Sequence, residues 1–229
     1  MHLLIPAAGL GKRMGSDHNK LFLSLLGKPL LTWTLLAAEA SEKISWIGII
    51  GKSYDFPSFQ KIFANFSMTK PVELIQGGET RQQSVYNGLQ ALPVEAKKTL
   101  IHDGARCLVT PELFDRCAEE LLTCQGLITA IPVKDTIKVV DRYKLIQNTP
   151  NRSQLWAAQT PQGFDVKLLK VCHEKVRNLN WEFTDDAALF EKFKLPVKIV
   201  DGEETNLKIT TKIDLSIAEF ILKNNFEIS

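Results

Sequence analysis

The residues best suited to chemistry lie near the start of the chain, where a short apolar run gives way to small residues and cations. The run Leu3–Ile5 has the character of a buried strand. The small residues and cations that follow it are Pro6, Ala7, Ala8, Gly9, Gly11, Lys12, Arg13 and Lys20. Small side chains let backbone N–H groups approach phosphate oxygens, and the cations supply charge. This pattern predicts a nucleotide-triphosphate cradle; the alternative is an ordinary turn with solvated cations.

The glycine spacing separates this loop from two better-known phosphate loops. Gly9, Gly11 and Gly15 read G-x-G-x-x-x-G, one residue longer than the dinucleotide fingerprint, which disfavours a dinucleotide-dependent dehydrogenase. Gly27-Lys28 is followed by proline and lacks the earlier glycine of a P-loop, which excludes a P-loop ATPase.

The elements that must position this loop alternate between strands and helices. Nearly continuous apolar strands indicate a parallel sheet covered on both faces. The predicted strands are Leu3–Ile5, Trp46–Ile50, Val72–Ile75, Leu100–Asp103, Leu127–Ile131 and Val197–Val200. The predicted helices are Leu30–Ala40, Arg81–Leu92, Pro111–Gln125, Val166–Asn178, one starting at Thr184, and Lys212–Lys223. We therefore expect an α/β fold with a Rossmann-like, mostly parallel, doubly wound sheet flanked by helices.

Two further segments end strands at the edge where such sheets bind ligands. Gly77-Gly78 follows one strand, and Ser84 lies in the first turn of the next helix, where free N–H groups can donate to a base; its alternative role is helix capping. Asp103 ends another strand, where it could bring a divalent cation to phosphates, or cap the turn, or pair with Arg106. Asp185 and Asp186 fall in a predicted first helical turn, which gives them a structural role.

Composition restricts the class of protein. The 229 residues are 45% hydrophobic, enough for one substantial core, so a single domain over residues 1–229 is expected. A net charge of +2 argues against a nucleic-acid binder with a basic face. Four cysteines without zinc spacing predict free thiols in a reducing compartment. Without a leader-like start or a membrane-length apolar run, a cytoplasmic protein with no membrane partner is expected.

The ordered motifs of the chain resemble those of sugar-phosphate nucleotidyltransferases, and within them the 2-C-methyl-D-erythritol 4-phosphate cytidylyltransferases. The resemblance covers the chain from Leu3 to about Phe220. The segments that carry it are Pro6–Met14 with Lys20, Gly77–Val85, His102–Arg106, Pro132–Thr136, Asn151-Arg152, Gln159–Gln162, Thr184–Ala187 and Asn206–Thr210. The chain departs from the family pattern at Glu79, Gly104 and Cys107, which leaves the role of the Glu79 side chain open.

The resemblance implies the site. The residues it assigns to CTP are Pro6, Ala7, Ala8, Gly9, Gly11, Lys12, Gly78, Glu79, Arg81, Ser84, Asp103 and Gly104. The base is read by backbone groups around Ala7, Gly78 and Ser84. The residues it assigns to the acceptor sugar phosphate are Asp103, Arg106, Thr136, Arg152, Thr160 and Lys208. Arg13, Lys20, Arg152 and Lys208 are the implied catalytic residues, and Mg²⁺ is carried by the CTP phosphates with help from Asp103. On its residue type alone, Lys208 could equally be solvated surface.

Residues 137–151 break the strand–helix rhythm. Two short stretches, Thr136–Val140 and Leu145–Thr149, flank a polar turn and predict a β-hairpin. A lone hairpin has too little core to stand by itself, so it should lie on another surface. The resemblance implies a dimerisation arm that embraces a second subunit; the alternative is an edge hairpin of the main sheet.

The resemblance implies an enzyme that joins CTP and 2-C-methyl-D-erythritol 4-phosphate and releases pyrophosphate, in the non-mevalonate route to isoprenoid precursors. Its product would be 4-diphosphocytidyl-2-C-methyl-D-erythritol. A ribitol-5-phosphate cytidylyltransferase would share the fold and the CTP site. A protein of another class, a non-catalytic regulator that binds CTP or a sugar phosphate, is the remaining alternative.

Overall fold

A seven-stranded sheet with strand order β11-β7-β10-β6-β1-β4-β5 organises the computed structural model of the chain. The structure describes residues 1–9, 19–66, 68–176, 181 and 183–226. The strands of this sheet are β1 (His2–Pro6), β4 (Trp46–Gly51), β5 (Val72–Gln76), β6 (Lys98–Ile101), β7 (Gly126–Pro132), β10 (Trp156–Asp165) and β11 (Lys198–Asp201). Only β10 runs antiparallel to its neighbours in it. The predicted mostly parallel α/β fold is confirmed.

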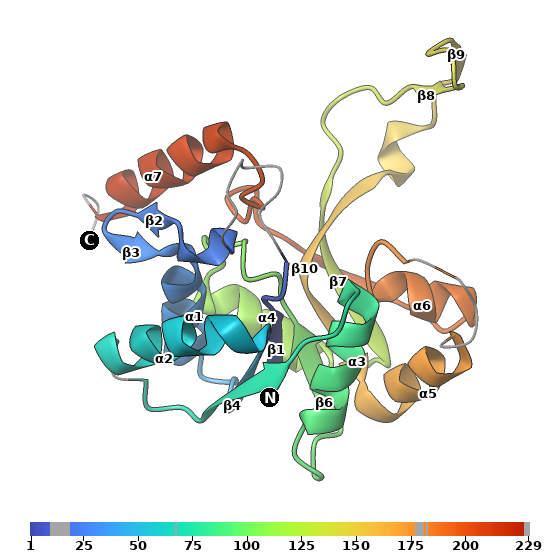
Figure 1. Cartoon of the computed structure of the whole chain (residues 1–229). Helices are drawn as coiled ribbons and strands as arrows, with labels where there is room; N and C mark the ends of the chain where they lie inside the picture. The colour runs from blue at the N-terminus through green and yellow to red at the C-terminus, as the bar shows by residue number, and fades with distance from the viewer. Residues whose placement is uncertain (10–18, 67, 177–180, 182, 227–229) are drawn as a thin grey trace.

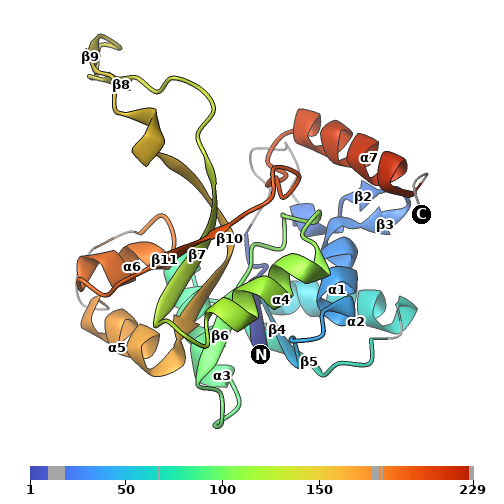
Figure 2. The same ribbon diagram turned by 180° about the vertical axis from the view of Figure 1, so that it is seen from behind.

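Helices cover both faces of the sheet (Figures 1 and 2). They are α1 (Leu30–Ala40), α2 (Phe56–Asn65), α3 (Arg81–Ala91), α4 (Pro111–Glu120), α5 (Val166–Val176), α6 (Ala187–Lys192) and α7 (Lys212–Phe226). Short 3₁₀ turns are η2 (Lys20–Phe22), η3 (Ser53–Asp55) and η4 (Arg152–Gln154). Helices α1, α2 and α4 lie on one face, and α3, α5 and α6 lie on the other.

The period of two along β1 explains why the sheet is covered twice. Leu3 and Ile5 are fully buried in the core cluster that also holds α1 and α4 side chains, whereas Leu4 is fully buried in the cluster that holds α3 and α5 side chains. Burying a leucine or isoleucine side chain contributes roughly 1.5–3 kcal/mol to the free energy of folding, so the first strand stabilises both layers.

Several predicted boundaries differ from those observed. The helix starting at Pro111 ends at Glu120, because the next residues form a turn in which the Thr123 N–H bonds the Glu120 carbonyl. Helix α6 begins at Ala187 rather than at Thr184. Helix α5 is described to Val176, and the predicted last turn of that helix lies outside the described residues.

Strand β10 and helix α2 were not predicted from the sequence. Pro161 and Gly163 argue against a strand, since proline cannot donate to a ladder and glycine packs no side chain. The structure accommodates this sequence with a register shift between Ala158 and Gln162, so that the irregular segment 159–161 interrupts the pairing with β7. A bulge of this kind commonly re-aims side chains beside a binding site.

The predicted hairpin is present as β8 (Val139–Val140) and β9 (Ile146–Asn148), which form a two-stranded sheet of their own. It projects away from the main sheet at the top right of Figure 1. The alternative of an edge hairpin of the main sheet is therefore wrong.

Three other features of the described residues complete the fold. A small sheet of β2 (Ser24–Leu25) and β3 (Lys28–Pro29) packs with α7 over a third apolar cluster around Leu30 and Ile209. All four cysteines are free thiols, and Cys107, Cys117 and Cys172 are buried. No helix within the described part of the chain is both long and apolar enough to cross a bilayer.

Candidate active site

A cavity of about 490 Å³ opens at the carboxyl ends of β1, β4, β5 and β6. Its lining includes most residues that the sequence assigned to CTP. Those residues are Pro6, Ala7, Ala8, Gly9, Gly78, Glu79, Arg81, Ser84, Asp103 and Gly104, and the lining also includes Lys20 and Lys208, which were predicted as catalytic residues. The structure thus joins the start of the glycine-rich loop, the loop after β5 and the acid after β6. Gly11, Lys12 and Arg13 lie outside the described residues.

Lys20 is positioned by the residue before it and by a bond of its own ammonium group. The preceding residue, Asn19, is buried; its Oδ1 accepts the Leu21 N–H at 3.1 Å, and its Nδ2 donates to the Ala7 carbonyl at 2.6 Å. The Lys20 Nζ donates to the Ile209 carbonyl at 2.8 Å. The cation therefore links the end of β1 to the segment that carries Lys208. Asn19 itself was not among the predicted site residues, although an asparagine before a short helical turn is a capping signal.

The loop expected to read the base is satisfied internally. The Gly78 N–H donates to the Ser84 Oγ at 3.0 Å, and the Ala7 N–H donates to the Ile50 carbonyl at 2.7 Å. The Gly78 carbonyl accepts from the Lys52 Nζ at 3.0 Å, and each carbonyl oxygen retains a second lone pair. Carbonyl acceptors rather than these N–H donors are therefore free to meet a ligand.

The Glu79 side chain pairs with Lys52 at the rim of the cavity. It is 90% exposed, and its Oε1 lies 3.4 Å from the Lys52 Nζ. Lys52 and Tyr54 both line the cavity and were missed from the sequence. The sequence could have predicted both residues, because they follow β4, a buried strand that neighbours β1 in the parallel sheet, and ligands bind at the carboxyl ends of such strands.

Asp103 and Lys208 form an ion pair inside the cavity, with Oδ2 and Nζ 2.7 Å apart. Burial opposes ionisation of Asp103, but the Lys208 ammonium and the Arg81 guanidinium outweigh it, so the pKa of the Asp103 carboxyl is lowered. Lys208 therefore lines the cavity through this ion pair, with its side chain still 40% exposed to solvent.

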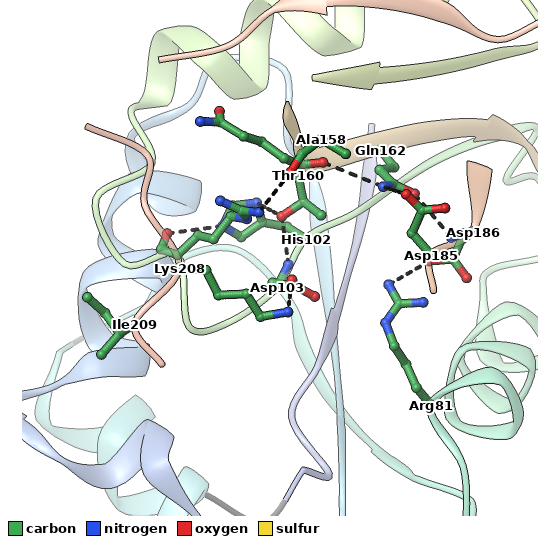
Figure 3. A network of polar contacts seen from close by, with 12 residues as sticks. Arg81, His102, Asp103, Ala158, Thr160, Gln162, Asp185, Asp186, Lys208 and Ile209 are labelled. Carbon is green, nitrogen blue, oxygen red and sulfur yellow. Dashed lines mark hydrogen bonds and ion pairs between the residues drawn. The ribbon is translucent and has the colours of Figure 1, made fainter. Parts of the chain in front are cut away.

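Arg81 reaches back from the cavity to a buried acid. Its Nη2 lies 2.7 Å from the Asp186 Oδ2, and the Asp186 side chain is 2% exposed (Figure 3). Burial alone would lower the pKa of Arg81, but the Asp186 carboxylate reverses this and raises it. Asp185 caps the start of α6 by accepting the Ala188 N–H at 3.0 Å. The purely structural role predicted for Asp186 is thus incomplete, because its carboxylate orients a residue of the cavity.

A buried histidine connects Asp103 to β10. The His102 Nδ1 lies 3.1 Å from the Thr160 Oγ1, and this oxygen accepts the Asp103 N–H at 3.0 Å (Figure 3). The Arg106 guanidinium donates to the Asn206 carbonyl at 2.8 Å and to the Ala158 carbonyl at 3.2 Å. Thr160 and Arg106 thus sit directly behind Asp103, within the same chain.

Thr136 and Arg152 lie elsewhere. They flank the exposed hairpin, and the Arg152 Nη1 donates to the Lys134 carbonyl at 2.7 Å. Neither residue is in the lining of the cavity described above. Within one described chain the structure therefore gathers Asp103, Lys208 and Thr160 but not the two residues of the arm. Among the described residues, no group of three or more His, Cys, Asp or Glu side chains is placed to hold a metal ion.

Burial of His102 predicts a pH-dependent stability. Desolvation lowers the pKa of His102 from 6.5 to about 4. The unfolded chain therefore binds a proton that the folded chain excludes as pH falls from 6.5 to 4, and the free energy of unfolding should decrease by up to roughly 3 kcal/mol over that range. Urea unfolding at pH 7, 5.5 and 4.5 measures this decrease. His102→Gln should show a shallower pH dependence, and equal dependence in both proteins would contradict the assignment.

A nucleotide-binding α/β protein is the class that this sheet and cavity define, since small residues and cations meet in a cavity at the carboxyl ends of parallel strands. The sequence profile of the family of 2-C-methyl-D-erythritol 4-phosphate cytidylyltransferases (IspD) matches residues 1–224. The chain belongs to this family.

Individual relatives agree with that assignment. The chain is 76% identical to the 2-C-methyl-D-erythritol 4-phosphate cytidylyltransferase of Crocosphaera subtropica, over 99% of each chain. It is 69% identical to the protein of that name from Trichodesmium erythraeum, over 97% of this chain and 98% of the relative. Among solved structures, 4-diphosphocytidyl-2C-methyl-D-erythritol synthase from Anaerococcus prevotii superimposes with a TM-score of 0.86 at 32% identity, covering 97% of each chain.

Proposed function

We propose that the chain transfers the cytidylyl group of CTP to 2-C-methyl-D-erythritol 4-phosphate in the cavity lined by Lys20, Gly78, Asp103 and Lys208. The reaction itself is that of the family to which the chain belongs. The single observation that carries the assignment to this cavity is the convergence of the glycine-rich start, the base loop and the Asp103–Lys208 pair at one sheet edge.

The chemistry is a direct displacement. An oxygen of the acceptor phosphate attacks the α-phosphorus of CTP, a new P–O bond forms, and the bond to the leaving pyrophosphate breaks. A phosphate monoester is already ionised at neutral pH, so the attacking oxygen needs no base. The tasks left to the chain are to align two anions and to stabilise the charge that gathers at the α-phosphorus. We assign that stabilisation to Lys20, together with Arg13.

A divalent cation carried by CTP fits the residues present. The Asp103 carboxylate lies in the cavity and the Glu79 carboxylate at its rim, and Mg²⁺ takes its other ligands readily from phosphate oxygens and water. Such a cation would neutralise charge on the triphosphate when bound.

The proposal is tested by pyrophosphate release from CTP with a panel of acceptors. Methylerythritol phosphate should support turnover, and ribitol 5-phosphate should not replace it. Release only with ribitol 5-phosphate would assign the chain to the other acceptor, and no release with any acceptor would indicate a binding protein without catalysis.

CTP should be preferred over ATP and GTP by more than about tenfold in kcat/KM. The base loop packs tightly against the start of the chain, since a Cβ added at Gly77 would lie 2.9 Å from the Ala8 Cβ and 3.2 Å from the Gly51 carbonyl oxygen. We expect the carbonyls of Ala7 and Gly78 to accept from the amino group of cytosine, while a purine would not fit. Initial rates with each nucleotide at matched concentration measure this preference, and equal rates with ATP would remove the base site from this loop.

We further propose that the protein is a homodimer built through the hairpin arm. The arm exposes apolar side chains that a monomer would leave in water, including Val140 at 49% and Ile146 at 63% exposure. A second copy of the chain would cover them. Thr136 and Arg152 flank the arm and lie outside their own cavity, so in a dimer they would complete the acceptor site of the partner.

Ile146→Asp should weaken the dimer and the activity together, because it places a charge in the surface that the partner covers. The matched control is Val94→Asp, since Val94 is fully exposed in a loop outside the arm and should tolerate the charge. Sedimentation velocity and steady-state rates on the same samples report both effects. A wild-type monomer with full activity would overturn the proposal.

A further inference from the structure

His102 lies at the end of β6 with no exposed surface, and both of its ring nitrogens have polar neighbours. Its Nδ1 is 3.1 Å from the Thr160 Oγ1, and its Nε2 is 3.2 Å from the Arg106 carbonyl oxygen. The edge of the ring packs against Phe114, with ring centroids 5.1 Å apart. The imidazole is therefore fixed in place between the strand β10 and the turn that carries Asp103 and Arg106 (Figure 3).

These neighbours determine where the protons lie. A backbone carbonyl only accepts, so Nε2 must carry the ring proton and donate to Arg106. Burial lowers the pKa of His102 to about 4, so the ring is neutral at physiological pH and has one N–H. Its Nδ1 is then an acceptor, and the Thr160 hydroxyl donates to it. The Thr160 oxygen also accepts the Asp103 N–H at 3.0 Å.

We propose that His102 is a positioning residue for the acceptor site: its Nδ1 accepts a hydrogen bond from the Thr160 hydroxyl and so fixes both Thr160 and the backbone of Asp103. The proposal rests on the function proposed above, because it places the acceptor beside Asp103 and Lys208. With its proton committed, Thr160 can offer an incoming group only its remaining lone pair.

The hydrogen bond from Thr160 to His102 determines which part of the acceptor Thr160 can recognise. An acceptor phosphate at neutral pH presents mainly lone pairs, so it cannot bond favourably to a hydroxyl that no longer donates. A hydroxyl group of the polyol, in contrast, can donate a hydrogen bond to the Thr160 oxygen. The phosphate is then bound by two cations, Lys208 of one chain and Arg152 from the arm of the second copy in the proposed dimer. Through its hydrogen bond with Thr160, His102 therefore makes this residue suited to the polyol end of the acceptor and not to its phosphate end.

Two substitutions at position 102 divide the functions of the ring. The asparagine amide oxygen occupies about the place of Nδ1, so His102→Asn keeps the acceptor for Thr160. The glutamine amide nitrogen reaches about the place of Nε2, so His102→Gln keeps the donor to Arg106 and loses the acceptor. A purely structural role for the ring predicts similar effects of both changes, whereas the proposal predicts different ones.

His102→Gln should raise KM for methylerythritol phosphate about tenfold, the effect of one lost hydrogen bond to a buried group, with KM for CTP within about twofold of wild type. His102→Asn should keep the acceptor KM within about threefold of wild type. Equal acceptor KM values for the two variants, or equal changes in both substrate KM values, would overturn the proposal.

Variants of Thr160 keep the test decisive if either His102 variant fails to fold. Thr160→Val removes the hydroxyl and should raise the acceptor KM as His102→Gln does, and by more than Thr160→Ser, which retains the hydroxyl. The double variant His102→Gln/Thr160→Val should be no worse than Thr160→Val alone, because both changes remove one linkage. Additive losses would refute the proton assignment.

Nitrogen-15 NMR of the wild-type protein tests the assignment without relying on activity. The chain has only 4 histidines, and the His102 signals are identified by their loss in His102→Asn. We expect an unprotonated Nδ1 and a protonated Nε2; the opposite tautomer would overturn the inference. Absence of cytidylyl transfer by the wild-type protein would instead contradict the proposed function, and the tautomer result would still stand by itself.

Discussion

Lys20→Ala is expected to lower kcat for cytidylyl transfer by about 10²–10³-fold, the usual effect of removing one preorganised donor to a developing charge. KM for CTP should change much less, because the ammonium is needed most as the α-phosphate becomes crowded in the transition state. The geometry supports this role, since Lys20 lines the cavity and its Nζ is fixed on the Ile209 carbonyl.

The same geometry requires a second variant. Lys20 also ties down the segment next to Lys208, so alanine could act by loosening that segment. Lys20→Gln keeps a side-chain donor that can reach toward the Ile209 carbonyl but carries no charge. It should lose nearly as much turnover as Lys20→Ala, while Lys43→Ala, which removes an exposed ion pair with Glu119, should leave the rate unchanged. Near-normal turnover in either Lys20 variant would remove Lys20 from the mechanism.

Arg152→Ala is expected to raise KM for methylerythritol phosphate at least about tenfold, because the bidentate contact that we propose with the acceptor phosphate would be lost. Lys208→Ala should affect the same substrate, since in the proposed site both cations serve one dianion. If Lys208 also reaches the α-phosphate, kcat will fall as well in that variant. Steady-state kinetics of both single variants and of the double variant measure the coupling between them. Additive losses with an unchanged acceptor KM would show that neither residue holds the acceptor.

Mixed dimers test whether Arg152 serves the partner. If each site combines Lys20 of one chain with Arg152 of the other, a dimer of one Lys20→Ala chain and one Arg152→Ala chain contains one intact site. Random exchange of the two variants should then restore about one quarter of wild-type activity, because half of the dimers are mixed and each has one working site. No recovery after verified subunit exchange would place Arg152 in its own chain's site.

The sequence predicted the layers of the fold better than the boundaries of the individual helices and strands. Nearly continuous apolar strands predict a sheet that is covered on both faces, so the helices on both faces were expected. Strand β10 was missed because Pro161 and Gly163 disfavour a strand locally, and only pairing with β6 and β7 overrides that preference. The early end of α4 depends on the turn at Thr123, which no helical period reveals.

For the candidate site too, some features could be predicted from the sequence and others could not. Residues in motifs, such as Gly78, Asp103 and Lys208, could be assigned to one edge of the sheet because parallel strands end there. The partners that hold them could not, since Asp186 meets Arg81, and His102 meets Thr160, only through tertiary packing. Whether Thr136 and Arg152 share a chain with the rest of the site depends on a second subunit, which no local pattern specifies.

The most direct measurement of the central claim is a competition for one nucleotide. The wild-type protein is given CTP with equal concentrations of methylerythritol phosphate and ribitol 5-phosphate, and the products are identified by mass spectrometry, with Lys20→Ala as the inactive control. We predict that 4-diphosphocytidyl-2-C-methyl-D-erythritol and pyrophosphate form almost exclusively. A predominance of the cytidylylated ribitol product, or equal product formation by Lys20→Ala, would contradict the account.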